Sequence, residues 1–189
     1  MENVSKKIKK IIDEHPEMWE ETTLKNGEIL VETGNIVKQI FYIKSGRVRA
    51  FTNDFKNAKE VILNFFETND TVVSYGSLMK EIPVRINIQA IEETKIYSIS
   101  KENWKMVKKQ KPEVNDLLLV LMTEYLTMAL DFIAKTASRT VVERYLLAFE
   151  KFPFLSSCSD ETVALYLGVS RRTIQNVKAD LKIKNQKSK

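Results

Sequence analysis

Hydrophobic and polar positions along the chain change their period twice. Residues 5–20 follow a helical period that Pro16 interrupts or ends, with an apolar side at Ile8, Ile11 and Ile12. Residues 24–100 instead contain short β-type runs between Gly, Asn, Asp and charged residues, namely EILVET, QIFYIKSG, RVRAFTN, KEVILNFF, TVVSY, INIQAI and KIYSIS. This spacing predicts a short helix followed by an antiparallel barrel or sandwich.

After Trp104 the period is helical again, and Pro112 opens the longest apolar segment, EVNDLLLVLMTEYLTMALDFIAK. Two stripes recur in this segment with alternating steps of three and four residues. The first is Leu118, Leu121, Tyr125, Met128 and Phe132, and the second is Leu119, Met122, Leu126, Ala129 and Ile133. One stripe can cover the β region and the other a second subunit. We assign the first stripe to a parallel dimer interface; a helix buried within one monomer is the alternative.

A further helix is predicted after the polar residues Thr136 and Ser138, and Pro153 ends it. Its inward stripe is Val142, Tyr145, Leu146 and Phe149. Because small and polar residues interrupt the heptad pattern at 136–139, we expect a hinge there. A change in the β region could then rotate everything that follows.

Residues 159–182, SDETVALYLGVSRRTIQNVKADLK, have the spacing of a helix-turn-helix. The residues that would form its two-helix core are Val163, Leu167, Val169, Ile174, Val177 and Leu181. Ala164 allows close approach of the helices, Gly168 supplies the left-handed turn, and Ser170 can cap the second helix. The outer face of that helix is left polar.

This polar face is suited to bind double-stranded DNA. Arginine can bond guanine, Asn or Gln can bond adenine, and Lys or Thr can hold phosphate oxygens. The predicted DNA-contacting residues are Ser170, Arg171, Arg172, Thr173, Gln175, Asn176, Lys178 and Lys182. A terminal helical hairpin with a solvated charged face is the alternative.

The charge of the chain strengthens the DNA interpretation. The net charge is +5, and residues 171–189 alone hold seven Lys or Arg against one Asp, so the remaining residues are close to neutral. Neutralising phosphate at this position would release counterions. No run approaches the roughly 20 apolar residues of a membrane span and the N-terminus lacks a secretory signal pattern, so we expect a cytoplasmic protein with no membrane partner.

Catalytic and metal chemistry lack their usual residues. One cysteine, Cys158, and one histidine, His15, provide no internal disulfide and no zinc, haem or iron-sulfur ligand set. The sequence has no G-x-S-x-G motif and no Gly-rich phosphate loop. Adjacent Glu92 and Glu93 would point to opposite strand faces and make a poor catalytic pair. We therefore expect no metal, no cofactor and no enzyme activity, including that of a metal-dependent cupin-like catalyst.

Two segments in this order resemble the cyclic-AMP receptor and fumarate-nitrate regulator family, Crp/Fnr. One is SDETVALYLGVSRRTIQNV, and the other is the set Leu24, Gly27, Glu28, Leu30, Gly34, Tyr42, Ile43, Gly46 and Val48. The resemblance implies an α+β fold with an N-terminal antiparallel β-roll over 1–111, a long dimerisation helix over 112–137 and a helix-turn-helix DNA-binding domain over 138–189. It also implies a homodimeric transcriptional regulator, with RNA polymerase and a small-molecule effector as further candidate partners.

The effector residues of the family carry over unevenly. Family members that bind cyclic nucleotide have Gly-Glu at the start of the phosphate cassette and Arg followed by a small hydroxyl residue at its end. The corresponding positions here hold Val73, Ser74, Val84 and Arg85. A one-residue shift turns a strand side chain to the other face, so we expect no tight cyclic-AMP binding. The candidate contacts for an unknown effector are Ser74, Tyr75, Ser77, Arg85 and Asn87, although Tyr75 is also a candidate core residue.

The recognition helix departs from the family pattern as well. A frequent pattern of Arg, Glu, Thr and then Arg reads here as Arg171, Arg172, Thr173 and Asn176, which implies a different operator. No obvious β wing follows this helix, so the wing is absent or the basic tail replaces it. An effector-binding or protein-interaction module with a weak or vestigial DNA-binding domain is therefore the alternative function.

Overall fold

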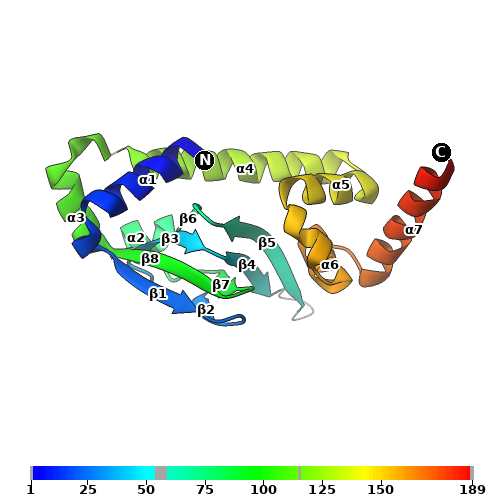
Figure 1. The fold of residues 1–189 in the computed structure, drawn as a ribbon, viewed down its shortest axis with the longest axis horizontal. Helices are drawn as coiled ribbons and strands as arrows, with labels where there is room; N and C mark the ends of the chain where they lie inside the picture. Colours follow the sequence, from blue (N-terminus) through cyan, green and yellow to red (C-terminus); the bar gives the residue numbers. More distant parts are fainter. Residues whose placement is uncertain (1, 54–58, 115, 188–189) are drawn as a thin grey trace. The chain divides into compact units, whose positions relative to one another are not determined.

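The computed structural model describes residues 2–53, 59–114 and 116–187 (Figure 1). The chain divides into two compact units, Met1–Thr52 with Leu63–Thr127, and Asn53–Ile62 with Met128–Lys189. The first unit contains a β roll and the helices beside it. The second contains the helices that follow Met128, including the predicted helix-turn-helix.

The strands of the described residues form two four-stranded sheets, in the orders β1-β8-β3-β6 and β2-β7-β4-β5. Their bounds are β1 Glu20–Leu24, β2 Ile29–Val31, β3 Gln39–Ser45, β4 Arg47–Asn53, β5 Glu60–Glu67, β6 Thr71–Val73, β7 Asn87–Ala90 and β8 Thr94–Ser100. The described pairings are antiparallel. The predicted antiparallel roll is confirmed, and each of the seven predicted runs contains a strand.

Strand β3 is buried on both faces, which explains its continuous apolar run. Phe41 and Ile43 belong to the core between the two sheets. Ile40 and Tyr42 point the other way, into a core shared with helices α1 (Glu2–Glu14), α3 (Lys101–Gln110) and the start of α4 (Leu117–Ser138). Because successive side chains of a strand alternate between faces, one short strand ties the sheet interior to the helical layer.

The N-terminal prediction is wrong at its end. The predicted helix over 5–20 stops at Glu14, Pro16 opens a short 3-10 helix, η1 (Pro16–Met18), and Glu20 begins β1. Strand β1 was missed because only Leu24 in its EETTL sequence is buried. Its pairing with β8 comes from backbone hydrogen bonds and leaves almost no apolar alternation in the sequence.

Two boundaries between strands and helices also differ from the prediction. The run TVVSY stops being a strand at Val73, and Tyr75 begins a short helix, α2 (Tyr75–Lys80). Helix α3 begins at Lys101 and not after Trp104, because the side chain of Ser100 accepts a hydrogen bond of 3.1 Å from the backbone N–H of Asn103.

The helical elements after α3 follow the predicted order. Pro112 opens a separate 3-10 turn, η2 (Pro112–Val114), and α4 begins only at Leu117. The remaining elements are α5 Val141–Lys151, η3 Pro153–Ser157, α6 Asp160–Leu167 and α7 Arg171–Lys187. A capping box between Thr140 and Glu143 starts α5, so the helical break lies at 139–140, at the end of the predicted hinge.

Helix α4 is also long and apolar enough to cross a membrane, the one such helix in the described part of the chain. The expectation that no segment approaches this composition is therefore wrong for α4. A single helix of this kind is weak evidence for a span, because a core helix of a soluble protein passes the same test.

The turn between β3 and β4 requires glycine. Gly46 has φ +92°, and a Cβ there would lie 2.6 Å from both the carbonyl oxygen of Glu93 and Oγ1 of Thr94. We expect Gly46→Ala to lower the free energy of unfolding by about 2–4 kcal/mol, since backbone strain and overpacking each cost about 1–3 kcal/mol. Urea unfolding followed by circular dichroism measures this. Gly76→Ala in α2 is the control, because a Cβ at Gly76 would meet no neighbouring group within 4 Å. Equal losses of unfolding free energy in the two variants would show that the turn does not require glycine at position 46.

Candidate nucleic-acid interface

Helices α6 and α7 form the predicted helix-turn-helix. Val163, Ala164, Leu167, Ile174 and Val177 are all buried between the helices and their neighbours. Gly168 ends α6 in the left-handed conformation, with φ 64°. Its turn directs α7 away from α6 without the Cβ strain that another residue would meet.

The N-terminus of α7 is capped as predicted. Oγ of Ser170 accepts a hydrogen bond of 3.1 Å from the backbone N–H of Thr173, and the two hydroxyls lie 2.8 Å apart. Ser170 and Thr173 therefore help to build the helix itself, which reduces the hydroxyl groups left for phosphate.

The remaining predicted residues lie on the solvent side of α7. Ile174 and Val177 face inward, and exposed side chains occupy the positions between and around them. These exposed side chains are Arg171, Arg172, Gln175, Asn176 and Lys182. The helix thus presents two guanidiniums, two amides and an ammonium in one neighbourhood.

Lys178 has a partner that sequence reasoning missed. Its ammonium forms an ion pair with the carboxylate of Asp160, at the start of α6. This hydrogen bond raises the pKa of Lys178 above its usual value. The pair joins the two helices, so Lys178 contributes to the packing of the motif, and its contact with phosphate stays a prediction. The separation of 18 residues across a turn gave no sequence signal.

The basic tail is helical where the structure describes it. Helix α7 continues through Lys187, well beyond the predicted motif, and no strand follows α6 in the described residues. The side chains of 184–189, with three further lysines, lie outside the described residues.

In the roll, two candidate effector residues hold a loop. Oγ of the buried Ser77 accepts a bond of 2.6 Å from the N–H of Val37, and Oδ1 of Asn87 accepts one of 2.9 Å from the N–H of Thr33. Both side chains satisfy backbone groups of 33–37. Their side-chain oxygens are used by the fold itself.

The other three candidates are divided between the interior and the surface. Tyr75 is half-buried, and burial raises the pKa of its phenol. Val84 is buried in the roll core while Arg85 is exposed, in keeping with the predicted opposite orientation of these neighbours. Ser74 precedes α2 but makes no side-chain capping bond. The structure therefore brings Ser74, Tyr75 and Ser77 to one short segment and leaves Arg85 in solvent.

The stripe of α4 predicted for the dimer interface is wrong for its central residues. Leu121 is only 2% exposed and lies in the core with α1 and α3. Tyr125 packs edge-on against Phe66 and Tyr75, and its hydroxyl donates to the carbonyl oxygen of Thr71. Leu118 also packs against the first unit's core.

The two distal members of that stripe belong to the second unit. Phe132 packs against Tyr166 with ring centroids 6.3 Å apart, and Met128 lines a pocket there. Phe132 is still 43% exposed, and the other large apolar side chains of α4 that stay exposed are Leu119, Val120, Met122, Leu126, Leu130 and Ile133. The second predicted stripe is thus the unpartnered one.

Two lysines of α7, Lys178 and Lys182, allow a direct comparison. We expect Lys178→Gln to lower the free energy of unfolding of the helix-turn-helix by up to about 1 kcal/mol, the usual range for a surface ion pair. Lys182→Gln should leave it unchanged, because Lys182 is exposed. Thermal unfolding at low and high salt measures both variants. Identical stabilities of the two variants would show that Lys178 does not contribute to the packing of the motif.

Comparison with known proteins agrees with this architecture. The family profile of the cyclic nucleotide-binding domain matches residues 21–111. Curated proteins give no match. The global regulator CLP of Xanthomonas campestris, described as c-di-GMP responsive, aligns with a TM-score of 0.75 at 15% identity over 93% of this chain and 92% of its own.

Other solved structures give the same result. FixK2 of Bradyrhizobium japonicum has a TM-score of 0.72 at 16% identity, covering 88% of this chain and 86% of its own. A protein of Eubacterium rectale assigned to the Crp/Fnr family of transcriptional regulators has a TM-score of 0.72 at 19% identity, covering 93% and 82%. Residues 21–111 therefore form a domain of the cyclic nucleotide-binding family, and the chain has the Crp/Fnr fold that its motifs predicted.

Proposed function

We propose that this protein is a homodimeric, sequence-specific DNA-binding regulator of transcription that works in the cytoplasm. The observation that carries the proposal is the solvent-facing surface of α7, where Arg171, Arg172, Gln175 and Asn176 stand exposed while Ile174 and Val177 fix the helix from beneath. In this architecture the second helix of the motif enters the major groove with its N-terminal residues on base edges.

The exposed side chains divide by their chemistry. Arg171 and Arg172 can donate two bonds each to guanine, and Gln175 and Asn176 can pair with adenine. Lys182, two turns further along, suits a phosphate. Together they support sequence readout at the start of α7 and a less selective electrostatic contact towards its end.

The exposed stripe of α4 supports dimerisation. Leu119, Met122, Leu126 and Ile133 recur in steps of three, four and seven, the spacing of a coiled-coil seam. Pairing two such helices would bury this apolar surface and hold two copies of α7 about one DNA turn, roughly 34 Å, apart. We assign 1–111 to effector sensing, 112–137 to dimerisation and 138–189 to DNA binding, with RNA polymerase as a further partner.

The roll supports an effector different from cyclic AMP, or control without a ligand there. Ser77 and Asn87 already bond backbone groups, and Arg85 faces solvent. A cyclic phosphate needs a buried cation, and none of these residues supplies one.

The DNA contacts are tested by selecting a preferred site from random duplex DNA and then removing Arg171. We expect Arg171→Ala to weaken binding to the selected site by about 1–3 kcal/mol and to relax specificity at one base pair. Lys109→Ala, which removes an exposed cation on α3 in the first unit, is the control and should change neither quantity. Fluorescence anisotropy over a range of salt concentrations measures both.

Two results would contradict this function. If no sequence is enriched and binding is weak and independent of salt, the chain is better described as an effector-binding or protein-interaction module, because phosphate contacts always give salt dependence. If a site is enriched but the Arg171→Ala variant binds it with unchanged affinity and specificity, base recognition lies elsewhere on the chain.

The dimer is tested on α4. We expect Leu126→Glu to give monomers in sedimentation velocity, because the side chain is 59% exposed in the single chain and would place two like charges in the seam. Leu146→Glu on α5 is the matched control and should stay dimeric, because Leu146, which was wrongly predicted to face inward, is 51% exposed. Leu121→Glu should unfold the first unit instead, since Leu121 is part of its core. A dimeric Leu126→Glu variant would move the interface away from this stripe.

A further inference from the structure

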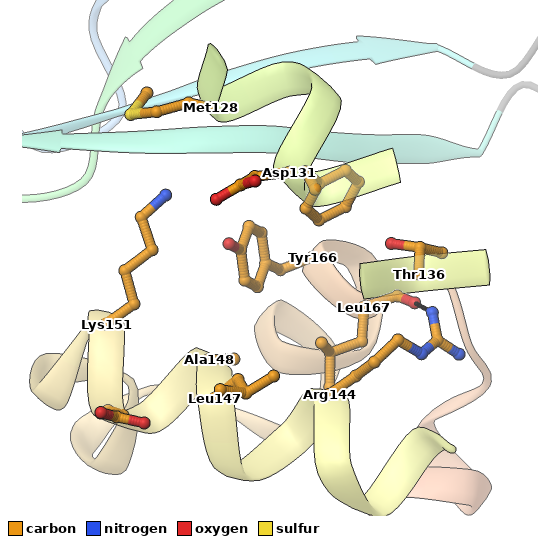
Figure 2. Close-up of a pocket in the computed structure, with 11 residues that line it drawn as sticks. Met128, Asp131, Thr136, Arg144, Leu147, Ala148, Lys151, Tyr166 and Leu167 are labelled. Carbon is orange, nitrogen blue, oxygen red and sulfur yellow. Dashed lines mark hydrogen bonds between the residues drawn. The ribbon is translucent and has the colours of Figure 1, made fainter. Parts of the chain in front are cut away.

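A pocket lies within the second unit, among the distal half of α4, α5 and α6 (Figure 2). Its volume is about 500 Å³, within the range of small-molecule sites. It is separate from the roll, in which family members hold their nucleotide, and from the exposed face of α7. None of the functions assigned above uses it.

The walls of the pocket are mostly apolar and aromatic. Phe132 and Tyr166 meet at a tilted angle of 43°, and Leu147 and Ala148 of α5 add aliphatic surface. Burial raises the pKa of Tyr166 to about 12, so its phenol stays a neutral hydrogen-bonding group at physiological pH. Such walls suit a flat ring, because aromatic side chains gain from stacked or edge-on contacts.

One cation in this pocket lacks a complete set of acceptors. Nη1 of Arg144 donates a bond of 3.1 Å to the carbonyl oxygen of Leu167, drawn as the dashed line in Figure 2. Its Nε is buried and has no hydrogen-bond partner. Within the described residues no carboxylate pairs with this guanidinium. A half-buried guanidinium that has donors left over suits a planar carboxylate.

The other charged groups limit the charge of the ligand. Asp131 and Glu150 line the pocket together with Lys151 and Arg144, so the acidic and basic side chains balance. A ligand with several negative charges, such as a cyclic dinucleotide, would meet two carboxylates. A single carboxylate can reach Arg144 without that repulsion.

We propose that this pocket binds a small aromatic monocarboxylate, with its carboxylate on Arg144 and its ring beside Phe132 and Tyr166. Leu167 is the last residue of α6 and directly precedes Gly168, so a ligand on Arg144 acts next to the turn of the helix-turn-helix. This consequence for DNA binding rests on the proposed function, whereas binding itself does not.

The test uses the full chain and indole-3-acetate and phenylacetate as probes, with phenylacetamide as the uncharged counterpart. Isothermal titration should give one site per chain for the acids and affinity at least about tenfold lower for the amide, because a charge-assisted bond is lost. Methyl spectra of methionine-labelled protein locate the site. The Met128 signal, assigned with Met128→Leu, should shift, and those of Met18 and Met79 in the first unit should not.

Three variants distinguish the contribution of the Arg144 guanidinium to binding from that of the pocket's packing. Arg144→Gln should weaken the acids at least about tenfold and leave the amide unchanged, whereas Arg139→Gln should change neither. Leu147→Trp should abolish binding by filling the pocket, with folding checked by circular dichroism.

The proposal is overturned if neither acid binds at millimolar concentration, if Arg144→Gln binds the acids as tightly as the unaltered chain, or if Met79 responds in place of Met128. Binding by a chain that shows no affinity for DNA would refute the proposed function and leave the pocket assignment intact.

Discussion

The apolar surface of α4 constrains everything else in this chain. A helix of 22 residues carries apolar side chains on most of its circumference, and each unit covers only part of them. Leu117 and Leu121 are buried in the first unit, and Phe132 meets Tyr166 in the second. The stripe that remains costs free energy in water in proportion to its area, which favours any arrangement that covers it. The proposed dimer follows from this exposed surface more directly than from the resemblance to a family.

The choice between the two stripes shows where sequence reasoning stops. Both repeat with steps of three and four, so periodicity identifies the helix but not the partner of each face. The deciding contacts are Tyr125 on Phe66 and the hydrogen bond from its hydroxyl to Thr71. These residues lie more than 50 positions apart in the chain, and a tyrosine buried beside an available carbonyl leaves no local pattern. By contrast, Gly168 and Ser170 act on their own neighbours, which is why the turn and the cap could be predicted.

The same difference between local and long-range contacts explains which other elements and side-chain roles could be predicted from the sequence. Strands with a clear apolar core, such as β3, were found, whereas β1 was missed because its residues pair through the backbone and stay exposed. On α7 the exposed arginines and amides were predicted from helical spacing alone. The ion pair of Lys178 was not predicted, because Asp160, its partner, lies on another helix. A side chain with a potential for DNA contact can equally be used to join two helices, and only the three-dimensional structure distinguishes these roles.

The hydrogen bonding of polar side chains differs between the two units, and this difference indicates where a small-molecule effector would bind. In the roll, the side-chain oxygens of Ser77 and Asn87 accept hydrogen bonds from the backbone of residues 33–37. The ring of Tyr125 packs against the core beside β6. In the second unit, Arg144 keeps a buried nitrogen without an acceptor beside an open pocket. Because a buried donor without an acceptor costs about 1–3 kcal/mol, a ligand that supplies an acceptor to Arg144 is favoured in this pocket. On the proposals made here, a chain whose roll holds no effector can still respond to a small molecule, through a site next to the turn that precedes α7.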